Sequence, residues 1–232
     1  MLKNYVQQVF ELRYEPYIDM LDRRGFLTDL LSKKLKMPEW IVGNDRIDIT
    51  SKDKKERCFI SYKELGYALK NPGSHSHFQD RTTKFLNIMS DSGSHFQLNS
   101  IKRLGVRSNY LIGYEGKFEE LLKIFKKSYL NYSDEKFSLF KGTFIDAGVL
   151  LNFKTSDGYF NTNCGPMKKE QYSQFFDGII IEDLPDTALF LDIDYFKNDF
   201  NDANWKNIID LIQKYSQRSN EIHDAISAVM FK

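Results

Sequence analysis

The order of hydrophobic patterns along the chain restricts its architecture more than any other feature. In residues 5–14, apolar side chains occupy alternate positions, as in a half-buried strand, and Gln8 interrupts the apolar series. Over residues 18–35 the spacing becomes helical. Short strand patterns then occur at residues 47–50, 58–62 and 65–69. A helical pattern at 74–91 completes this first series.

The second half of the chain repeats this order of patterns. A long strand pattern at 96–112 is followed by a helical pattern at 113–130. Further strand patterns occur at residues 144–153, 159–163, 178–181 and 188–196. The last helix can start at 202–204, and the polar residues at 218–220 predict a break before a final short helix.

Each half therefore consists of a strand, a helix, several strands and a helix, which predicts an α+β fold. We find no residue-level identity between the halves, so the repeat depends on element order alone. That order is similar to the duplicated saddle of the TATA-binding protein and to helix-grip folds, in which a curved antiparallel sheet carries helices on its convex face. We expect halves at 1–95 and 96–232 that form one continuous unit. Fold analogy of this kind carries no function by itself.

Charge and composition limit the classes of partner. The 33 Lys and Arg residues against 32 Asp and Glu give a net charge of +1, which disfavours a nucleic-acid partner but leaves room for a local basic patch. No apolar run approaches the roughly 18 residues of a membrane span, and the N-terminus lacks the apolar core of a signal peptide. Cys58 and Cys164 are far apart and are interpreted as free thiols of a cytoplasmic protein.

The common catalytic motifs are missing from the sequence. It contains no P-loop, no dinucleotide-binding glycine motif, no nucleophile elbow and no zincin helix. Cys164, which we place in a loop, lacks a recognisable His or Asn partner and is interpreted as an incidental thiol. These observations favour a non-enzymatic protein without a cofactor, although they do not decide against an enzyme.

Three strand patterns place charged residues on a single parity. Residues two apart on a strand point to the same face, as do Asp192 and Asp194. On the same principle, Glu11 and Arg13 point to the same face of the first strand. In the strand at 96–112 the residues of one parity are Arg103, Arg107 and Asn109, with Gly105 leaving room between the arginines. If these strands share a sheet, three acids and three arginines meet on its polar face.

This charged set has three interpretations. Equal numbers of acids and arginines favour a structural network of ion pairs. The arginines could instead bind an anion or a protein partner, because a guanidinium grips phosphate and carboxylate groups with two hydrogen bonds. Thirdly, Glu11, Asp192 and Asp194 could hold Mg²⁺ or Mn²⁺ in a nuclease or phosphotransferase.

His223 is a separate candidate on the last helix. It flanks an apolar stripe that includes Ile222 and Ile226. A histidine at such a boundary either hydrogen-bonds a neighbouring group or takes part in a site as a ligand-binding residue or general base. We retain it as a candidate ligand-binding residue.

Four short motifs together resemble a known family. They are VFELRY at 9–14, RLGVRSN at 103–109, LDIDYF at 191–196 and EIHDAI at 221–226. The chain resembles a sporadically distributed bacterial family with an ELRF-like first strand, an RLGLRYIN-like middle strand, a DIDxF-like strand and a C-terminal helix with a His. Ser108 departs from the pattern, because the family has an aromatic residue there. The family's biochemical role is unassigned, and its patchy distribution resembles that of phage-defence genes.

Our expectation from the sequence is therefore a cytoplasmic binding or regulatory protein, an accessory or sensor component of a phage-defence system. Its polar sheet face would engage a protein or a small anionic ligand through Arg13, Arg103, Arg107 and Asn109, with the acids orienting the arginines. The alternative is the metal-dependent nuclease or phosphotransferase. A nucleic-acid binder using the concave sheet is a third, less favoured hypothesis, and the sequence leaves homo-oligomerisation open.

Overall fold

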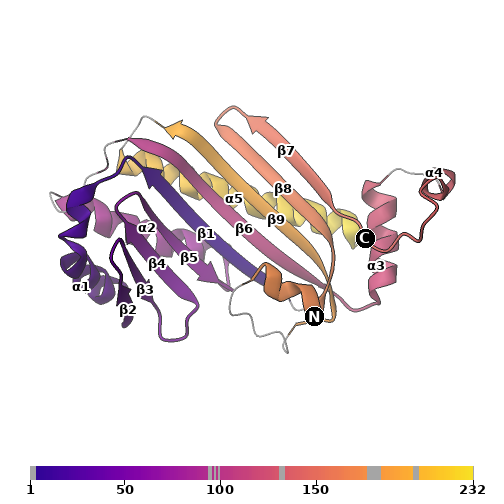
Figure 1. The fold of residues 1–232 in the computed structure, drawn as a ribbon, viewed down its shortest axis with the longest axis horizontal. Coiled ribbons are helices and arrows are strands. Elements are labelled where there is room, and N and C mark those ends of the chain that lie inside the picture. Colours follow the sequence, from indigo (N-terminus) through magenta and orange to yellow (C-terminus); the bar gives the residue numbers. More distant parts are fainter. Residues whose placement is uncertain are drawn as a thin grey trace.

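The computed structural model describes residues 4–93, 96, 98, 100–130, 134–176, 184–200 and 204–231. Within these residues nine strands form one sheet in the order β2-β3-β4-β5-β1-β6-β9-β8-β7, and each neighbouring pair is antiparallel (Figure 1). The strands are β1 (Asn4–Tyr14), β2 (Glu39–Val42), β3 (Arg46–Thr50), β4 (Glu56–Ser61), β5 (Glu64–Lys70), β6 (Ile101–Tyr114), β7 (Val149–Thr155), β8 (Gly158–Lys168) and β9 (Thr187–Phe200).

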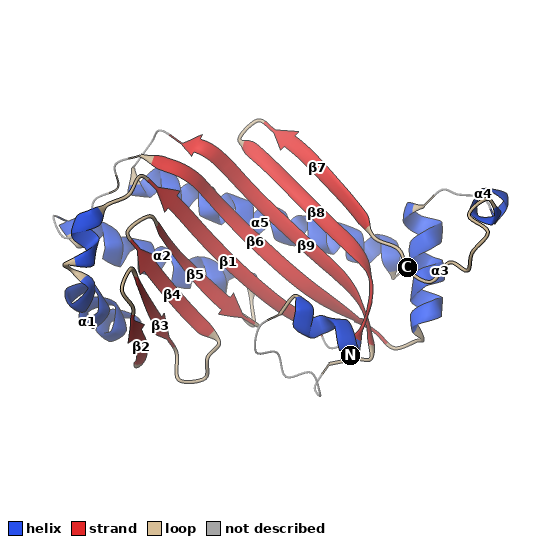
Figure 2. Cartoon of the chain, viewed as in Figure 1, coloured by secondary structure: helices blue, strands red, loops and turns tan. Residues whose placement is uncertain are grey.

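The longer helices cover one face of this sheet (Figure 2). The α-helices are α1 (Arg24–Leu35), α2 (His75–Asp91), α3 (Phe118–Tyr129), α4 (Asp134–Ser138) and α5 (Trp205–Met230), and the 3₁₀ helices are η1 (Ile18–Leu21) and η3 (Lys169–Gln174). Buried residues of α1, α2, α3 and α5 join one face of the sheet in the main core. The structure is therefore an α+β fold whose largest helices share one side.

A smaller core lies on the opposite face of the sheet. Tyr5, Leu111 and Phe190 point away from the helices and pack with Tyr172 of η3 and with Phe176. This cluster covers the end of β1, β6 and β9 that is near the N-terminus. The rest of this face, which we call the polar face, carries the charged residues that the sequence predicted.

The two polar residues that interrupt the apolar parity of β1 and β6 lie opposite each other. Gln8 and Ser108 are paired in the register of the two strands, and both are fully buried. The amide Nε2 of Gln8 donates a hydrogen bond of 3.2 Å to Oγ of Ser108. The pairing gives the amide nitrogen of Gln8 and the hydroxyl of Ser108 a buried partner, whereas Oε1 of Gln8 has none among the described residues.

The predicted α+β class, with a curved antiparallel sheet, is confirmed. In each half the first strand lies at the centre of the sheet and the last strand of that half lies beside it, so β1 neighbours β5 and β6 neighbours β9. This is the order expected of a duplicated unit, although the duplication and the division at residues 95 and 96 stay predictions. None of the described helices combines the length and the hydropathy needed to span a membrane.

Several predicted elements were wrong in detail. The last helix continues from Trp205 to Met230 without a break at 218–220. Ser219 and Asn220 are buried there and find partners, because Ser219 Oγ donates to the carbonyl of Tyr215 at 2.9 Å and Asn220 Oδ1 accepts from the Tyr110 hydroxyl at 2.8 Å.

Other strand and helix boundaries also differ from those predicted. The helix expected at 113–130 begins only at Phe118, since β6 stays paired with β9 as far as Tyr114. The helix expected at 18–35 is divided into η1 and α1, and the short edge strand β2 was not predicted. The strand predicted at 178–181 lies outside the described residues.

Candidate functional site

The sheet brings the predicted charged residues together on three adjacent strands. In the β1–β6 pair Arg13 lies opposite Arg103, and in the β6–β9 pair Arg107 lies opposite Asp194 and Asn109 opposite Asp192. The parity argument therefore placed these residues on the correct face. Their adjacency comes from the strand order, in which β1, β6 and β9 are neighbours.

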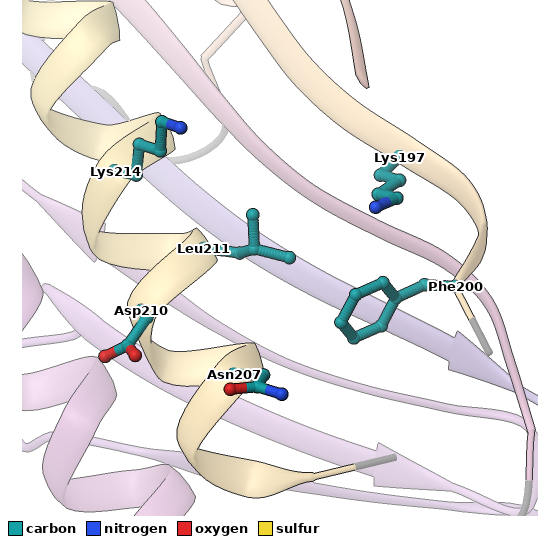
Figure 3. A pocket seen from close by; sticks show the side chains of 6 residues that line it. All are labelled: Lys197, Phe200, Asn207, Asp210, Leu211 and Lys214. Carbon is teal, nitrogen blue, oxygen red and sulfur yellow. The ribbon is translucent and has the colours of Figure 1, made fainter. Parts of the chain in front are cut away.

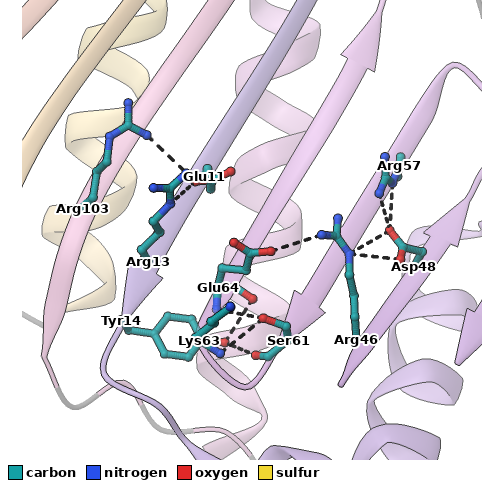
Figure 4. A network of polar contacts seen from close by, with 10 residues as sticks. All are labelled: Glu11, Arg13, Tyr14, Arg46, Asp48, Arg57, Ser61, Lys63, Glu64 and Arg103. Carbon is teal, nitrogen blue, oxygen red and sulfur yellow. Dashed lines mark hydrogen bonds and ion pairs between the residues drawn. The ribbon is translucent and has the colours of Figure 1, made fainter. Parts of the chain in front are cut away.

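Each acid of the set contacts an arginine. Asp192 accepts two hydrogen bonds from Arg107, at 2.8 Å from Nε and 2.6 Å from Nη2. Asp194 accepts from Nη2 of Arg103 at 2.8 and 3.1 Å. Glu11 accepts from Nε of Arg13 at 2.5 Å and lies 4.0 Å from Nη1 of Arg103 (Figure 4). The six charged residues thus form the ion-pair network that their equal numbers suggested.

Two of the three arginines in the network are more exposed than the acids, whereas Arg103, at 23%, is exposed about as little as they are. The side chains of Glu11, Asp192 and Asp194 are 25%, 14% and 23% exposed. Those of Arg13 and Arg107 are 53% and 56% exposed. Although the charges balance in number, the polar face therefore presents mainly guanidinium groups to solvent.

One cross-strand pair in this set is electrostatically unfavourable. Arg13 and Arg103 face each other directly in the register of β1 and β6. Like charges opposite each other on neighbouring antiparallel strands destabilise a sheet. Glu11 contacts both guanidinium groups and reduces the repulsion. A second anion between the two arginines would reduce it further.

Gly105 makes room for the long reach of Arg103. The Arg103 side chain runs past Gly105 to Asp194, and its guanidinium carbon lies 4.9 Å from the ring centre of Phe196. A Cβ at position 105 would lie 3.3 Å from Nη1 of Arg103 and 3.1 Å from the carbonyl oxygen of Tyr195. The glycine is therefore part of the arrangement, as its position between the arginines predicted.

Burial and hydrogen bonding shift two pKa values in the network. Burial raises the pKa of Asp194 above its ordinary value, against the attraction of Arg103 and Arg107. The hydrogen bonds to Asp192 raise the pKa of Arg107, so this guanidinium stays charged over the whole working range of pH. Within the network, burial therefore disfavours the ionised form of Asp194, whereas the contact with Asp192 favours the charged form of Arg107.

A groove runs along the polar face over these residues. It has a volume of about 610 Å³. The charged and polar side chains that line it include Glu11, Arg13, Arg103, Arg107, Asn109 and Asp194. Gln7, Val9 and Gly105 complete its floor, and Phe175 lines it beyond η3. We call this hollow the arginine groove. All but Asp192 and His223 of the predicted site residues line it.

Two residues of the groove escaped the sequence analysis. Gln7 shares the parity of Glu11 and Arg13, so the alternation in β1 could have identified it. Phe175 follows η3, and no periodic pattern connects that segment with the strands.

The carboxylates do not converge as metal ligands. Among the residues described, no group of three or more His, Cys, Asp or Glu side chains has the arrangement of a metal site. Arg103 lies between Glu11 and Asp194 and contacts both of them. The geometry therefore gives no support to the predicted alternative of a magnesium or manganese site.

His223 lies apart from the arginine groove. It belongs to α5, on the helix-covered side of the sheet, and its ring lies 4.5 Å from that of Tyr110. Its Nδ1 is 2.9 Å from Oδ1 of Asp224. Tyr110 points to the helix side of β6, so the sheet separates His223 from the arginines. The structure does not bring His223 together with the other predicted residues.

A second charged network continues the polar face over β3, β4 and β5 (Figure 4). Asp48 accepts from both Arg46 and Arg57, and Arg46 reaches Glu64 at 3.1 Å. Arg46 also covers the ring of Phe59, with its guanidinium carbon 4.1 Å from the ring centre. These residues lie outside the arginine groove and provide matched controls for it.

Another hollow lies on the helix side, between the end of β9 and the start of α5 (Figure 3). Lys197 and Phe200 come from β9, while Asn207, Asp210, Leu211 and Lys214 come from α5. Lys214 already pairs with Asp157 at 2.7 Å. This hollow is smaller and combines fewer groups able to bind a ligand, so the arginine groove is the better candidate.

Both cysteines are free thiols, and both are buried. The prediction that Cys164 lies in a loop was wrong. Cys164 lies within β8, because β8 stays paired with β9 as far as Lys168. Burial raises the pKa of its thiol to about 12, which makes it a poor nucleophile at neutral pH.

The comparisons with known proteins add no family. No model of a protein family matches the chain, and no curated protein gives a significant match.

Proposed function

We propose that this protein is a binding protein whose arginine groove captures a small anionic ligand. The observation that carries the proposal is the ion-pair network, in which partly buried acids hold the arginines and the more exposed side chains of Arg13 and Arg107 line the groove. The partly buried acids orient the arginines, and the exposed N–H groups of the guanidinium groups can donate hydrogen bonds to a ligand.

The residues have distinct roles in this proposal. Asp192 holds the Nε and Nη2 edge of Arg107, which leaves the opposite edge of that guanidinium for the anion. Glu11 holds Arg13 through Nε in the same way. Arg103 is held by Asp194 and faces the like-charged Arg13 across the β1–β6 pair. A phosphate or carboxylate bound at Arg13 and Arg103 would offset the repulsion between these two side chains.

The chemistry recognised is therefore that of a planar or tetrahedral oxyanion. An acidic side chain of a protein partner would satisfy the same donors. The resemblance to a patchily distributed bacterial family extends the proposal to an accessory or sensor role in phage defence. Plaque counts on cells that express the wild type or Arg107→Gln would test that role.

Calorimetric titration with inorganic phosphate, ribose 5-phosphate and citrate at low ionic strength tests the binding proposal directly. We expect binding by the wild type and a loss of about tenfold in affinity or more for Arg107→Gln and Arg13→Gln, since each removes charge-assisted hydrogen bonds. Arg57→Gln is the matched control, because Arg57 is 50% exposed on the same face and pairs with Asp48 outside the groove.

Two results would contradict the proposal. One is the absence of heat with all three anions while the wild type is folded. The other is an equal loss of affinity in Arg57→Gln and Arg107→Gln, which would indicate a non-specific effect of surface charge.

A further inference from the structure

The arginine groove has a second end that the arginines do not explain. Gln7 of β1 and Asn109 of β6 lie directly opposite each other in the strand register and both line the groove. The side-chain oxygens Oε1 of Gln7 and Oδ1 of Asn109 are buried, and neither has a hydrogen-bond partner in the described part of the chain. Buried carboxamide oxygens without donors are unfavourable, so a ligand with N–H groups would improve this end of the groove.

An aromatic ring borders the same groove. Phe175 follows η3, is 40% exposed and packs against Phe190 with 4.7 Å between the ring centres. Carboxamides of Asn and Gln pair with the amino edge of adenine through one donor and one acceptor, and aromatic rings stack on nucleobases. The groove therefore combines groups suited to both parts of a nucleotide. The two carboxamides and the aromatic ring suit the base, and the arginines suit the phosphate.

The spacing along β6 suits such a ligand. Asn109 is two residues from Arg107, or about 7 Å along a strand, and six residues from Arg103, or about 20 Å. A base at Asn109 would place its phosphate near Arg107, and further phosphates would extend towards Arg103 and Arg13. The groove volume of about 610 Å³ lies within the range usual for small-molecule sites.

We propose that the arginine groove is a nucleotide site with a base end and a phosphate end, and that its ligand is an adenine nucleotide. The amino group of the base donates to Asn109 and Gln7, the ring lies against Phe175, and Arg107 binds the phosphate. This inference rests on the proposed function, since it specifies the anion that the arginines bind.

Calorimetry with AMP, ribose 5-phosphate and adenosine separates the two ends. We expect the wild type to bind AMP about tenfold more tightly than ribose 5-phosphate, because hydrogen bonds and stacking with the base add to the phosphate contacts. Asn109→Leu and Gln7→Leu should lower the affinity for AMP more than the affinity for ribose 5-phosphate, and so abolish this preference. Asn161→Leu is the matched control, because Asn161 is an asparagine of β8 opposite Asp194 that does not line the groove.

The outcomes distinguish this inference from the proposed function. Equal affinity for AMP and ribose 5-phosphate would overturn the nucleotide assignment while leaving the anion site intact. A preference for AMP that survives in Asn109→Leu and Gln7→Leu would also overturn it, since the base would then bind elsewhere. If neither phosphate compound binds to the folded wild type, both proposals are wrong. Thermal melting of each variant verifies that it is folded.

Discussion

Arg103 bonds to Asp194 and not to the residue that faces it across the sheet. Its register partner on β9 is Asn198, whereas Asp194 faces Arg107. The 2.8 Å contact therefore crosses the sheet diagonally over Gly105. The offset places Asp194 near two guanidinium groups in a partly buried position, and the balance between burial and attraction decides how it titrates.

Asp194→Asn should have little effect on stability at neutral pH. Burial raises the pKa of this carboxyl despite Arg103 and Arg107, so the fold gains little from its ionised form. We expect a change of less than about 1 kcal/mol in the free energy of unfolding, compared with the roughly 3–5 kcal/mol that follows the breaking of a strongly favourable buried pair. Denaturant unfolding of wild type and variant, with and without Mn²⁺, measures the change.

The pH dependence of the same pair of proteins gives a sharper test. Because the folded-state pKa is raised above the ordinary 3.8, protonation of Asp194 stabilises the fold below that value, and this contribution is lost as the pH rises through the raised pKa. The wild type should therefore gain stability relative to Asp194→Asn as the pH falls towards about 4. A wild type that loses stability relative to the variant on acidification would contradict the shift, and a higher melting temperature with Mn²⁺ in the wild type alone would revive the metal hypothesis.

Asp157→Asn should show the opposite behaviour. Asp157, in the turn between β7 and β8, accepts from Lys214 at 2.7 Å and from Arg218 at 2.9 Å, and so holds the hairpin against α5. We expect a loss of about 1–2 kcal/mol at pH 7. The bond from Lys214 lowers the pKa of Asp157, so its contribution is present above 3.8 and is lost as the pH falls through the lowered value.

Unfolding of Asp157→Asn and Asp194→Asn in the same buffers compares the two directions. The stability difference between wild type and Asp157→Asn should shrink on acidification. Parallel pH profiles for the two variants would show that at least one of the two carboxyls does not titrate as its surroundings indicate.

The face of each strand could be predicted from the sequence, because the side-chain period of two is local. Glu11, Arg103 and Asp194 were assigned to the same face for this reason. The contacts between them depend on strand order and register, which are set by the whole sheet. The diagonal bond from Arg103 to Asp194 is therefore visible only in the structure.

Other parts of the fold depend on tertiary partners that a local pattern does not contain. Ser219 and Asn220 resemble a helix break in sequence, but Tyr215 and Tyr110 satisfy them within α5. Phe175 reaches the groove from a segment without periodicity. In the same way, the sequence of β1 alone shows Gln8 as an interruption of an apolar series, and its hydrogen-bond partner Ser108 is found only on the neighbouring strand.

The Gln8 and Ser108 pair should behave as a coupled unit. Ser108→Ala removes the acceptor of the Gln8 amide in a fully buried position, and Gln8→Leu removes its donor. We expect each single change to cost about 1–3 kcal/mol, and the double variant to cost less than the sum by about 0.5–3 kcal/mol. Urea unfolding of the four proteins of this cycle measures the coupling, and strict additivity would show that the two residues act independently.

Gly105→Ala should destabilise the sheet and weaken the site together. The added Cβ would lie 3.1 Å from the carbonyl oxygen of Tyr195 and 3.3 Å from Nη1 of Arg103, so it presses on the strand pairing and on the guanidinium. We expect a loss of about 1–3 kcal/mol in the free energy of unfolding and a weaker affinity for ribose 5-phosphate.

Gly25→Ala is the control for Gly105→Ala. A Cβ at Gly25 meets no heavy atom within 4 Å, and this glycine lies in α1, where alanine should instead stabilise the fold by about 0.5–1 kcal/mol. Since Gly25 is remote from the groove, its variant should bind ribose 5-phosphate as the wild type does. If Gly105→Ala matched Gly25→Ala in both stability and affinity, the space above Gly105 would have no part in directing Arg103 to Asp194.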